Sequence, residues 1–278
     1  MLEIRSQRAE PVSPLMVLNS FVKHRSLIIQ MAKREVAGRY RGSLLGLAWS
    51  LVHPLVMLGV YTFVFSVVFK SRWGDAAGTD SEFVMLLFCG LIVHSLFAEC
   101  VNRAPTLIVN NANYVKKVVF PLEILPCVSL GSALFFSGVN VGVLLLFYGV
   151  VHFSLHWTVL LFPLLLMPFA LFTLGVSWFL ASIGVFIQDI RQAIGIVTTV
   201  MLFLAPIFYP VTVLPEAYRP LLYLNPLTFV VEQARDVLIL GKLPSWQGLG
   251  VYFLCSVIAA CLGLLWFQKT RKGFADVI

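Results

Sequence analysis

The chain has 278 residues, of which 59% are hydrophobic and only 12% are charged, and its formal net charge is +7. Soluble domains carry about 25% charged residues, so this composition excludes an ordinary water-soluble protein and predicts an integral membrane protein. The five cysteines all lie in apolar runs without metal-ligand spacing, so we expect buried thiols, no disulfide and no metal site.

The N-terminal region is expected to be irregular over residues 1–25, because Pro11 and Pro14 disfavour an early helix. The first 43 residues are polar and basic, which predicts that no cleaved signal peptide is present. Ser26 suits the N-cap of a helix through Arg41. Apolar residues recur there at helical spacing and basic residues occupy other faces, which predicts an amphipathic helix over 26–41 at the membrane surface. A lipid anchor and a specific partner or head-group site both stay open.

Six apolar runs follow as candidate spans of a bilayer core of about 30 Å. They cover about 44–69, 83–104, 123–151, 158–187, 193–209 and 246–267. Pro54 is expected to kink the first run, and the fifth has only 17 residues, near the minimum for crossing. Gly138 and Gly142 form a GxxxG pair that permits close helix approach, with Asn140 between them. The predicted fold class is an all-α integral membrane protein with six transmembrane helices.

Two of the connecting segments are unusual. Residues 105–122 are too polar for lipid and too short for a domain, so we expect Pro105 to end the preceding helix and a short helix to follow it. That helix suits docking against another protein, with a simple connector as the alternative. Residues 206–245 are apolar but broken by six prolines, which predicts two short helices that dip into one membrane face. Thr228 is expected to cap the second of these, which would end near Leu240.

The orientation follows from Lys and Arg, which favour the cytoplasmic side. With six spans, both termini lie on one side, and that side carries 15 of the 20 basic residues. We therefore expect cytoplasmic N- and C-termini. If the short fifth run did not cross, the basic C-terminal tail would lie outside, which favours six spans.

Motifs for catalysis and nucleotide binding are missing: the sequence contains no GxxxxGK[ST], HExxH or GxSxG pattern. The acidic residues beside the spans lie near span ends, which argues against a proton-driven transporter. An intramembrane enzyme would have to use His53 or His94, although a lone histidine on an apolar helix is more often a packing residue. We expect no catalytic residue and no nucleic-acid partner.

Aromatic side chains cluster on the first and fifth spans. Stacked rings form good sugar-binding surfaces, because the face of a pyranose presents C–H groups to the ring. In a chain with 13% aromatic residues, lipid contact or core packing is the commoner role for any single ring. The candidate channel-lining residues are Tyr61, Phe65, Phe69, Phe203, Phe208 and Tyr209.

Three segments carry a resemblance to a known family. Residues 34–74, REVAGRYRGSLLGLAWSLVHPLVMLGVYTFVFSVVFKSRWG, resemble the first span of polysaccharide-exporting ABC transporter permeases. YVKKVVFPLEILP (114–126) is similar to the cytoplasmic loop of that family, and LNPLTFVVEQARDVL (224–238) to its extracytoplasmic gate. The nearest branch is the lipopolysaccharide O-antigen exporters, with teichoic-acid and capsule exporters as relatives. His53 stands where the family leads us to expect asparagine.

The resemblance implies a homodimer that works with two copies of a separate ATPase subunit, which would bind ATP and Mg²⁺. Residues 26–41 would form the interface helix and 105–118 the coupling helix against the ATPase. The first and fifth spans would line a channel at the dimer interface. The implied coupling residues are Asn110, Asn111, Asn113, Tyr114, Lys116 and Lys117.

The resemblance also implies a gate and a substrate. Residues 210–240 would form helices at the periplasmic mouth, with Pro210, Pro215, Asn225, Pro226, Thr228, Glu232 and Arg235 as gate residues. The substrate would be a polysaccharide on undecaprenyl diphosphate in the bacterial inner membrane. The cations Lys33, Arg34, Arg39 and Arg41 are expected to attract the diphosphate.

Other transport and enzyme classes remain as alternatives. A passive channel or secondary carrier would work without a partner, whereas a permease subunit would need its ATPase. An intramembrane transferase would lose activity when His53 or His94 is changed. A drug or small-lipid exporter of the same superfamily would share the topology and differ in its passage.

Overall fold

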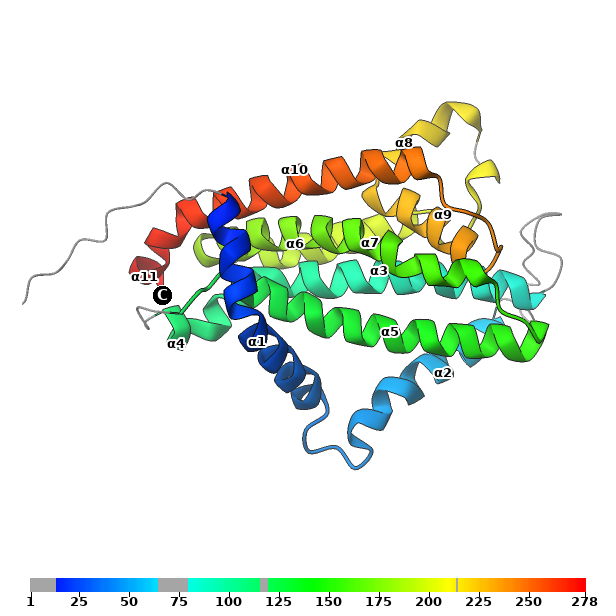
Figure 1. Ribbon diagram of the computed structural model, residues 1–278, viewed down its shortest axis with the longest axis horizontal. Coiled ribbons are helices and arrows are strands. Elements are labelled where there is room, and N and C mark those ends of the chain that lie inside the picture. Colours follow the sequence, from blue (N-terminus) through cyan, green and yellow to red (C-terminus); the bar gives the residue numbers. More distant parts are fainter. Residues whose placement is uncertain (1–13, 65–79, 116–119, 214) are drawn as a thin grey trace, which may run out of the picture.

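The computed structural model describes residues 14–64, 80–115, 120–213 and 215–278, and these residues form helices and turns without β-strands (Figure 1). The helices are α1 (Pro14–Arg39), α2 (Trp49–Thr62), α3 (Asp80–Leu107), α4 (Ala112–Val115), α5 (Ile124–His152), α6 (Phe162–Phe186), α7 (Ile190–Leu204), α8 (Arg219–Tyr223), α9 (Pro226–Leu238), α10 (Trp246–Thr270) and α11 (Phe274–Val277). Short 3₁₀ turns cover Gly46–Ala48, Val109–Asn111, Trp157–Leu161, Val211–Val213, Glu216–Tyr218 and Arg271–Gly273.

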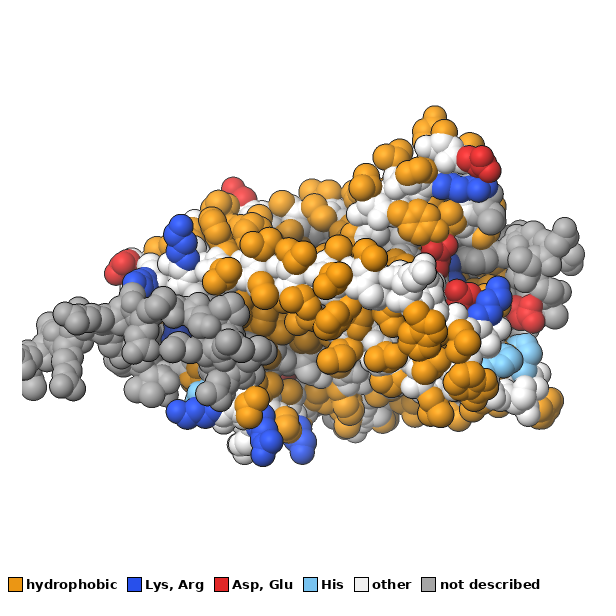
Figure 2. Space-filling model, turned by 45° about the horizontal axis from the view of Figure 1, so that its top comes forward, with side chains coloured by type: hydrophobic (Ala, Val, Ile, Leu, Met, Phe, Trp, Pro, Cys, Tyr) orange, Lys and Arg blue, Asp and Glu red, His pale blue; other side chains and the backbone are white. Residues whose placement is uncertain are grey.

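Within the described ranges, the four helices α3, α5, α6 and α10 are long and apolar enough to cross a membrane. They run side by side along the long axis, with α4 and α11 at one end of the bundle and α8 and α9 toward the other (Figure 1). Hydrophobic side chains cover the middle of the bundle and most charges lie toward its ends (Figure 2). The predicted all-α membrane fold is therefore confirmed, and this chain is a membrane protein.

The first and fifth predicted spans are shorter in the structure than the other four. Helix α2 has 14 residues and α7 has 15, so neither reaches the length of a spanning helix by itself. The remainder of the first run beyond residue 64 lies outside the described residues. Pro54 lies inside α2, where a kink was predicted. The six-span topology accordingly stays a prediction.

Helix α3 is the centre of the bundle. In the most apolar 18-residue stretch of α3, 72% is buried inside the molecule, whereas the corresponding share is 22–33% for α5, α6 and α10. It packs against α2, α5, α6, α7 and α9. Helix α3 therefore contacts most other helices directly, and the remaining ones pack against its neighbours.

Helices α6 and α10 pack with their backbones in direct contact. A Cβ atom placed on Gly263 of α10 would lie only 2.0 Å from the carbonyl oxygen of Gly175 on α6. Small residues permit this kind of approach in membrane helices. By contrast, Gly138 and Gly142, the pair predicted to allow close approach, have no neighbouring atom within 4 Å of an added Cβ. The GxxxG pair is therefore not used for packing within the described part of the chain.

Three predicted helix boundaries are wrong. Helix α1 begins at Pro14 rather than Ser26, because proline is well accommodated in the first turn of a helix. Helix α3 continues through Pro105 to Leu107, so the proline does not end it. Helix α9 is capped by Asn225, with Pro226 as its first residue, rather than by Thr228.

Candidate functional site

A network of two ion pairs joins α1 to α3. Arg39 of α1 pairs with Glu99 of α3, and Arg103 of α3 lies 2.6 Å from Glu35 of α1. Arg103 and Glu99, which are four residues apart on α3, also lie 3.7 Å from each other. The contacts across helices depend on how α1 lies over the bundle, so they have no signature in the spacing of the sequence.

The predicted diphosphate-binding cations are in two different situations. Lys33, Arg34 and Arg41 are exposed. Arg39 is engaged with Glu99, and its guanidinium also lies 4.2 Å from the centre of the Phe136 ring. Three of the four residues are thus accessible to an anion, whereas Arg39 already has a carboxylate partner.

The segment predicted to couple to a partner lies beside α1. Asn110 and Asn113 are exposed, while Asn111 donates a hydrogen bond to the Leu107 carbonyl (2.8 Å) that continues the end of α3. Tyr114 stacks on Phe120 with ring centres 4.3 Å apart. Lys116 and Lys117 lie outside the described residues.

A hollow of about 250 Å³ separates this segment from α1. Residues from both sides line it, including Arg34 and Glu35 of α1, Asn111 before α4 and Tyr114 of α4. The structure thus brings the two predicted partner-binding segments, which are far apart in the sequence, to opposite walls of one depression.

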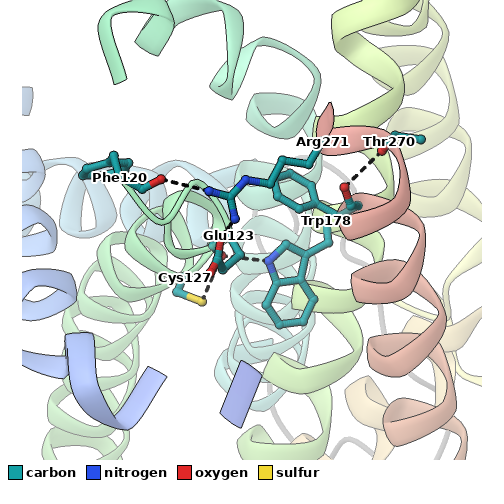
Figure 3. Close-up of polar contacts among 7 residues, drawn as sticks. Phe120, Glu123, Cys127, Trp178, Thr270 and Arg271 are labelled. Carbon is teal, nitrogen blue, oxygen red and sulfur yellow. Dashed lines mark hydrogen bonds and ion pairs between the residues drawn. The ribbon is translucent and has the colours of Figure 1, made fainter. Parts of the chain in front are cut away.

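A buried cluster fixes the chain just after the coupling segment (Figure 3). Arg271, at the end of α10, pairs with Glu123 at 2.9 Å and donates to the Phe120 carbonyl at 3.1 Å. Trp178 of α6 donates to the Glu123 carbonyl at 2.9 Å. The Glu123 side chain is only 8% exposed, so its charge depends on Arg271. Sequence reasoning missed this cluster, because its members are up to 151 residues apart.

The described aromatic residues lie on α2, on α7 and in the segment just after α7, and both helices pack against α3. Tyr61 of α2 approaches Phe88 of α3 with ring centres 6.5 Å apart. Phe203 of α7 stacks on Phe208 at 5.6 Å, and the Tyr209 hydroxyl donates to the Phe203 carbonyl at 2.9 Å. Phe203 remains 60% exposed. Phe65 and Phe69 lie outside the described residues.

The predicted gate residues form the joint between α7, α8 and α9. Asn225 accepts from the Leu227 amide and donates to the Met201 carbonyl on α7, both at 3.0 Å. Thr228 donates to the Leu222 carbonyl at 2.5 Å, so it braces α8 against α9. Pro210 and Pro215 introduce the two 3₁₀ turns before α8.

Two charged gate residues, Glu232 and Arg235, make further contacts. Tyr223 donates to Glu232 at 3.0 Å, and burial raises the pKa of the Glu232 carboxyl above its ordinary value. Arg235 is 4% exposed and donates to three carbonyls, those of Leu86 on α3 (2.9 Å), Pro206 (2.5 Å) and Ile207 (2.8 Å). This arginine therefore ties α9 to the central helix and satisfies the backbone where α7 ends.

The two histidines considered for catalysis have different settings. His94 of α3 hydrogen-bonds the Thr198 carbonyl on α7 at 3.0 Å, and the Thr198 hydroxyl donates to Asn102 at 3.1 Å. His94 thus contributes to the packing of α7 on α3. His53 of α2 is exposed and lies in a polar crevice considered further below.

Comparisons with known proteins agree on one family. The family model described as "ABC-2 type transporter" matches residues 26–239. A Klebsiella pneumoniae protein named O-antigen export system permease protein RfbA is 27% identical over 255 residues, covering 91% of this chain and 95% of the relative. Its Myxococcus xanthus namesake is 26% identical over 264 residues, covering 94% and 99%. The polysialic acid transport protein KpsM of Escherichia coli is 20% identical over 254 residues, covering 86% and 92%. This chain belongs to the ABC-2 type transporter family.

Proposed function

We propose that this chain is the transmembrane subunit of an ATP-driven exporter that moves undecaprenyl-diphosphate-linked polysaccharide, an O antigen, across the bacterial inner membrane. Two copies would enclose the passage between them. The names of the relatives, which export O antigen or transport polysialic acid, support a polysaccharide as the cargo.

The observation that carries the proposal is the poor covering of α2 and α7 by their own chain. The buried residues of α2 are Pro54 and Leu58, and that of α7 is Thr198, whereas α5 and α6 each bury 13 residues. Tyr61 lies on α2 and Phe203 on α7, and Phe208 and Tyr209 follow the end of α7. A second copy placed against α2 and α7 would cover them and leave a passage with aromatic walls between the two subunits.

The exposed cations of α1 support a negatively charged head group on the substrate. Lys33, Arg34 and Arg41 are exposed, and a diphosphate in the lipid head-group region would be attracted to them. Arg39 would serve mainly to hold α1 in place through Glu99. In the proposed orientation, both termini are cytoplasmic, and α8 and α9 form the periplasmic gate.

The hollow between α1 and the coupling segment supports a docking site for the ATPase subunit. Its walls present Arg34 and Glu35 on one side and Asn111 and Tyr114 on the other. The ATPase would bind ATP and Mg²⁺ and would supply the energy, because transport against a gradient needs a source of work that this chain's motifs do not provide. The Glu123–Arg271 cluster would pass motion of the coupling segment to α6 and α10.

A capsule exporter is the second candidate, favoured by the similarity to the polysialic acid transport protein. A teichoic-acid exporter would use the same chemistry, while a drug or small-lipid exporter has no support among the relatives described here.

The test is reconstitution of the chain in proteoliposomes with and without its ATPase. We expect ATP-dependent transfer of lipid-linked polysaccharide only when both subunits are present, and the same dependence for O antigen in intact cells. Uphill transfer by this chain alone would refute the proposal.

A further inference from the structure

A polar crevice of about 310 Å³ lies between α1, α2, α3 and α5. Its polar lining comes from Ser50 and His53 of α2, Ser95 and Glu99 of α3, and Asn140 of α5. None of these five residues belongs to the gate, the coupling segment or the aromatic faces described above.

Two of these groups, in Asn140 and His53, lie within predicted spans without a hydrogen-bond partner from the chain, whereas the hydroxyls of Ser50 and Ser95 donate to nearby backbone carbonyls. Asn140 lies near the middle of α5, and Ser95 and His53 are exposed. The amide of Asn140 and the imidazole of His53 have no hydrogen-bond partner among the residues that the structure describes. Leaving such groups against lipid costs several kcal/mol, so polar side chains in spans usually face water, a partner or a ligand.

The electrostatics of the crevice favour an uncharged ligand. Arg39 and Glu99 both line it and pair with each other, so their charges cancel. Arg39 is further held over the Phe136 ring at 4.2 Å. A phosphate would have to displace Glu99 to gain this arginine, whereas a neutral molecule can use the remaining amide, hydroxyl and imidazole groups directly.

We propose that this crevice binds a single neutral sugar unit, the one next to the diphosphate of the exported glycolipid. An amide, two hydroxyls, an imidazole and a carboxylate oxygen offer mixed donors and acceptors, which is what a ring of sugar hydroxyls requires. The aromatic ring of Tyr40 completes the lining, and the exposed cation Arg41 follows it directly in the chain. The volume is at the lower end of the ~300–1,000 Å³ typical of small-molecule sites, so it suits one sugar rather than an oligosaccharide.

This inference rests on the proposed function and is tested with the permease–ATPase complex in lipid nanodiscs. The probes are undecaprenyl diphosphate alone and the same carrier bearing one glucose, galactose or mannose, each followed by equilibrium binding of radiolabelled material. We expect the wild type to bind at least one sugar-bearing probe about tenfold more tightly than the bare carrier, since two or three hydrogen bonds are gained. Asn140→Leu and Ser95→Ala should each remove most of that preference and leave binding of the bare carrier unchanged.

Ser154→Ala is the matched control. Like Ser95, Ser154 is exposed and donates to a nearby backbone carbonyl, but it follows the far end of α5, outside the crevice. The Ser154→Ala variant should prefer the sugar-bearing carrier over the bare carrier to the same degree as the wild type. Equal binding of all probes by the wild type, or a preference that survives in both crevice variants, would overturn the crevice assignment alone. Failure of the wild type to bind any of these carriers would overturn the proposed function itself.

Discussion

Arg235 of α9 donates a hydrogen bond to the carbonyl of Leu86 on α3, a residue 149 positions earlier in the chain. The same guanidinium holds two carbonyls at the end of α7. One side chain therefore connects the gate region to the central helix and to a helix with an exposed aromatic face.

Replacing Arg235 by methionine should destabilise the protein by about 3 kcal/mol or more, because three buried carbonyls lose their donor at ~1–3 kcal/mol each. Arg235→Lys should recover only part of the loss, since an ammonium group cannot reproduce the planar fork. Thermal unfolding of the purified protein in detergent measures both effects. Arg219→Met, which removes a half-exposed residue paired with an exposed glutamate, should change stability by less than about 1 kcal/mol. Equal midpoints for Arg235→Met and Arg219→Met would contradict this prediction.

Gly263→Ala should destabilise the α6–α10 contact by roughly 1–3 kcal/mol, because the new methyl group would overlap the Gly175 carbonyl. Gly142→Ala is the control: an added methyl group meets no atom within 4 Å, and alanine favours the helix by up to about 1 kcal/mol. Gly263→Ala should therefore lower the unfolding temperature, whereas Gly142→Ala should raise it or leave it unchanged. A neutral Gly263→Ala would show that the two backbones can separate without cost.

The Arg39–Glu99 pair should be worth about 1 kcal/mol, a modest amount because both side chains remain partly exposed. Glu99→Arg should place like charges together and weaken the attachment of α1, and Arg39→Glu combined with Glu99→Arg should restore much of the stability. Limited proteolysis within α1 provides the measurement. If the double exchange is as sensitive to protease as the single variants, the pair does not hold α1.

Arg271→Met should separate ATP hydrolysis from export, because the link between the coupling segment and α10 is lost and the Glu123 carboxylate is left buried without its cation. We expect the reconstituted complex to retain hydrolysis while export falls several-fold. Lys269→Met, a change at an exposed residue two positions earlier, should leave the ratio of export to hydrolysis unchanged. A parallel decline of both activities in Arg271→Met would indicate simple loss of folded protein.

Phe203→Leu should slow export without lowering stability, since the ring is 60% exposed and leucine keeps an apolar side chain at that position. The expected loss is several-fold, because sugar–aromatic contacts depend on the flat face of the ring. Phe153→Leu, where the ring is 92% exposed beyond α5, serves as the comparison and should export normally. Normal export by Phe203→Leu would remove this ring from the passage.

The sequence predicted the long helices well and the contacts between them poorly. The bounds of α5 and α6 follow from uninterrupted apolar runs ended by polar residues, so they were close to the predicted 123–151 and 158–187. Prolines misled the prediction at Pro14, which the first turn of α1 accommodates, and at Pro105, beyond which α3 continues to Leu107.

The candidate site was predictable only as a set of segments. Arg235 was singled out by its resemblance to a gate motif, but its partners are backbone carbonyls, which carry no signature in the side-chain sequence. Glu123 and Arg271 similarly look like ordinary charges at helix ends until the fold places them 2.9 Å apart. Contacts of this kind depend on the tertiary arrangement and have no local pattern.

The contact between Gly175 and Gly263 has a mechanical consequence. Since main chain touches main chain there, no change of side-chain rotamer can loosen the joint, and we expect α6 and α10 to move together. Opening and closing would then involve movement of α2 and α7, which bury few of their residues, relative to α6 and α10.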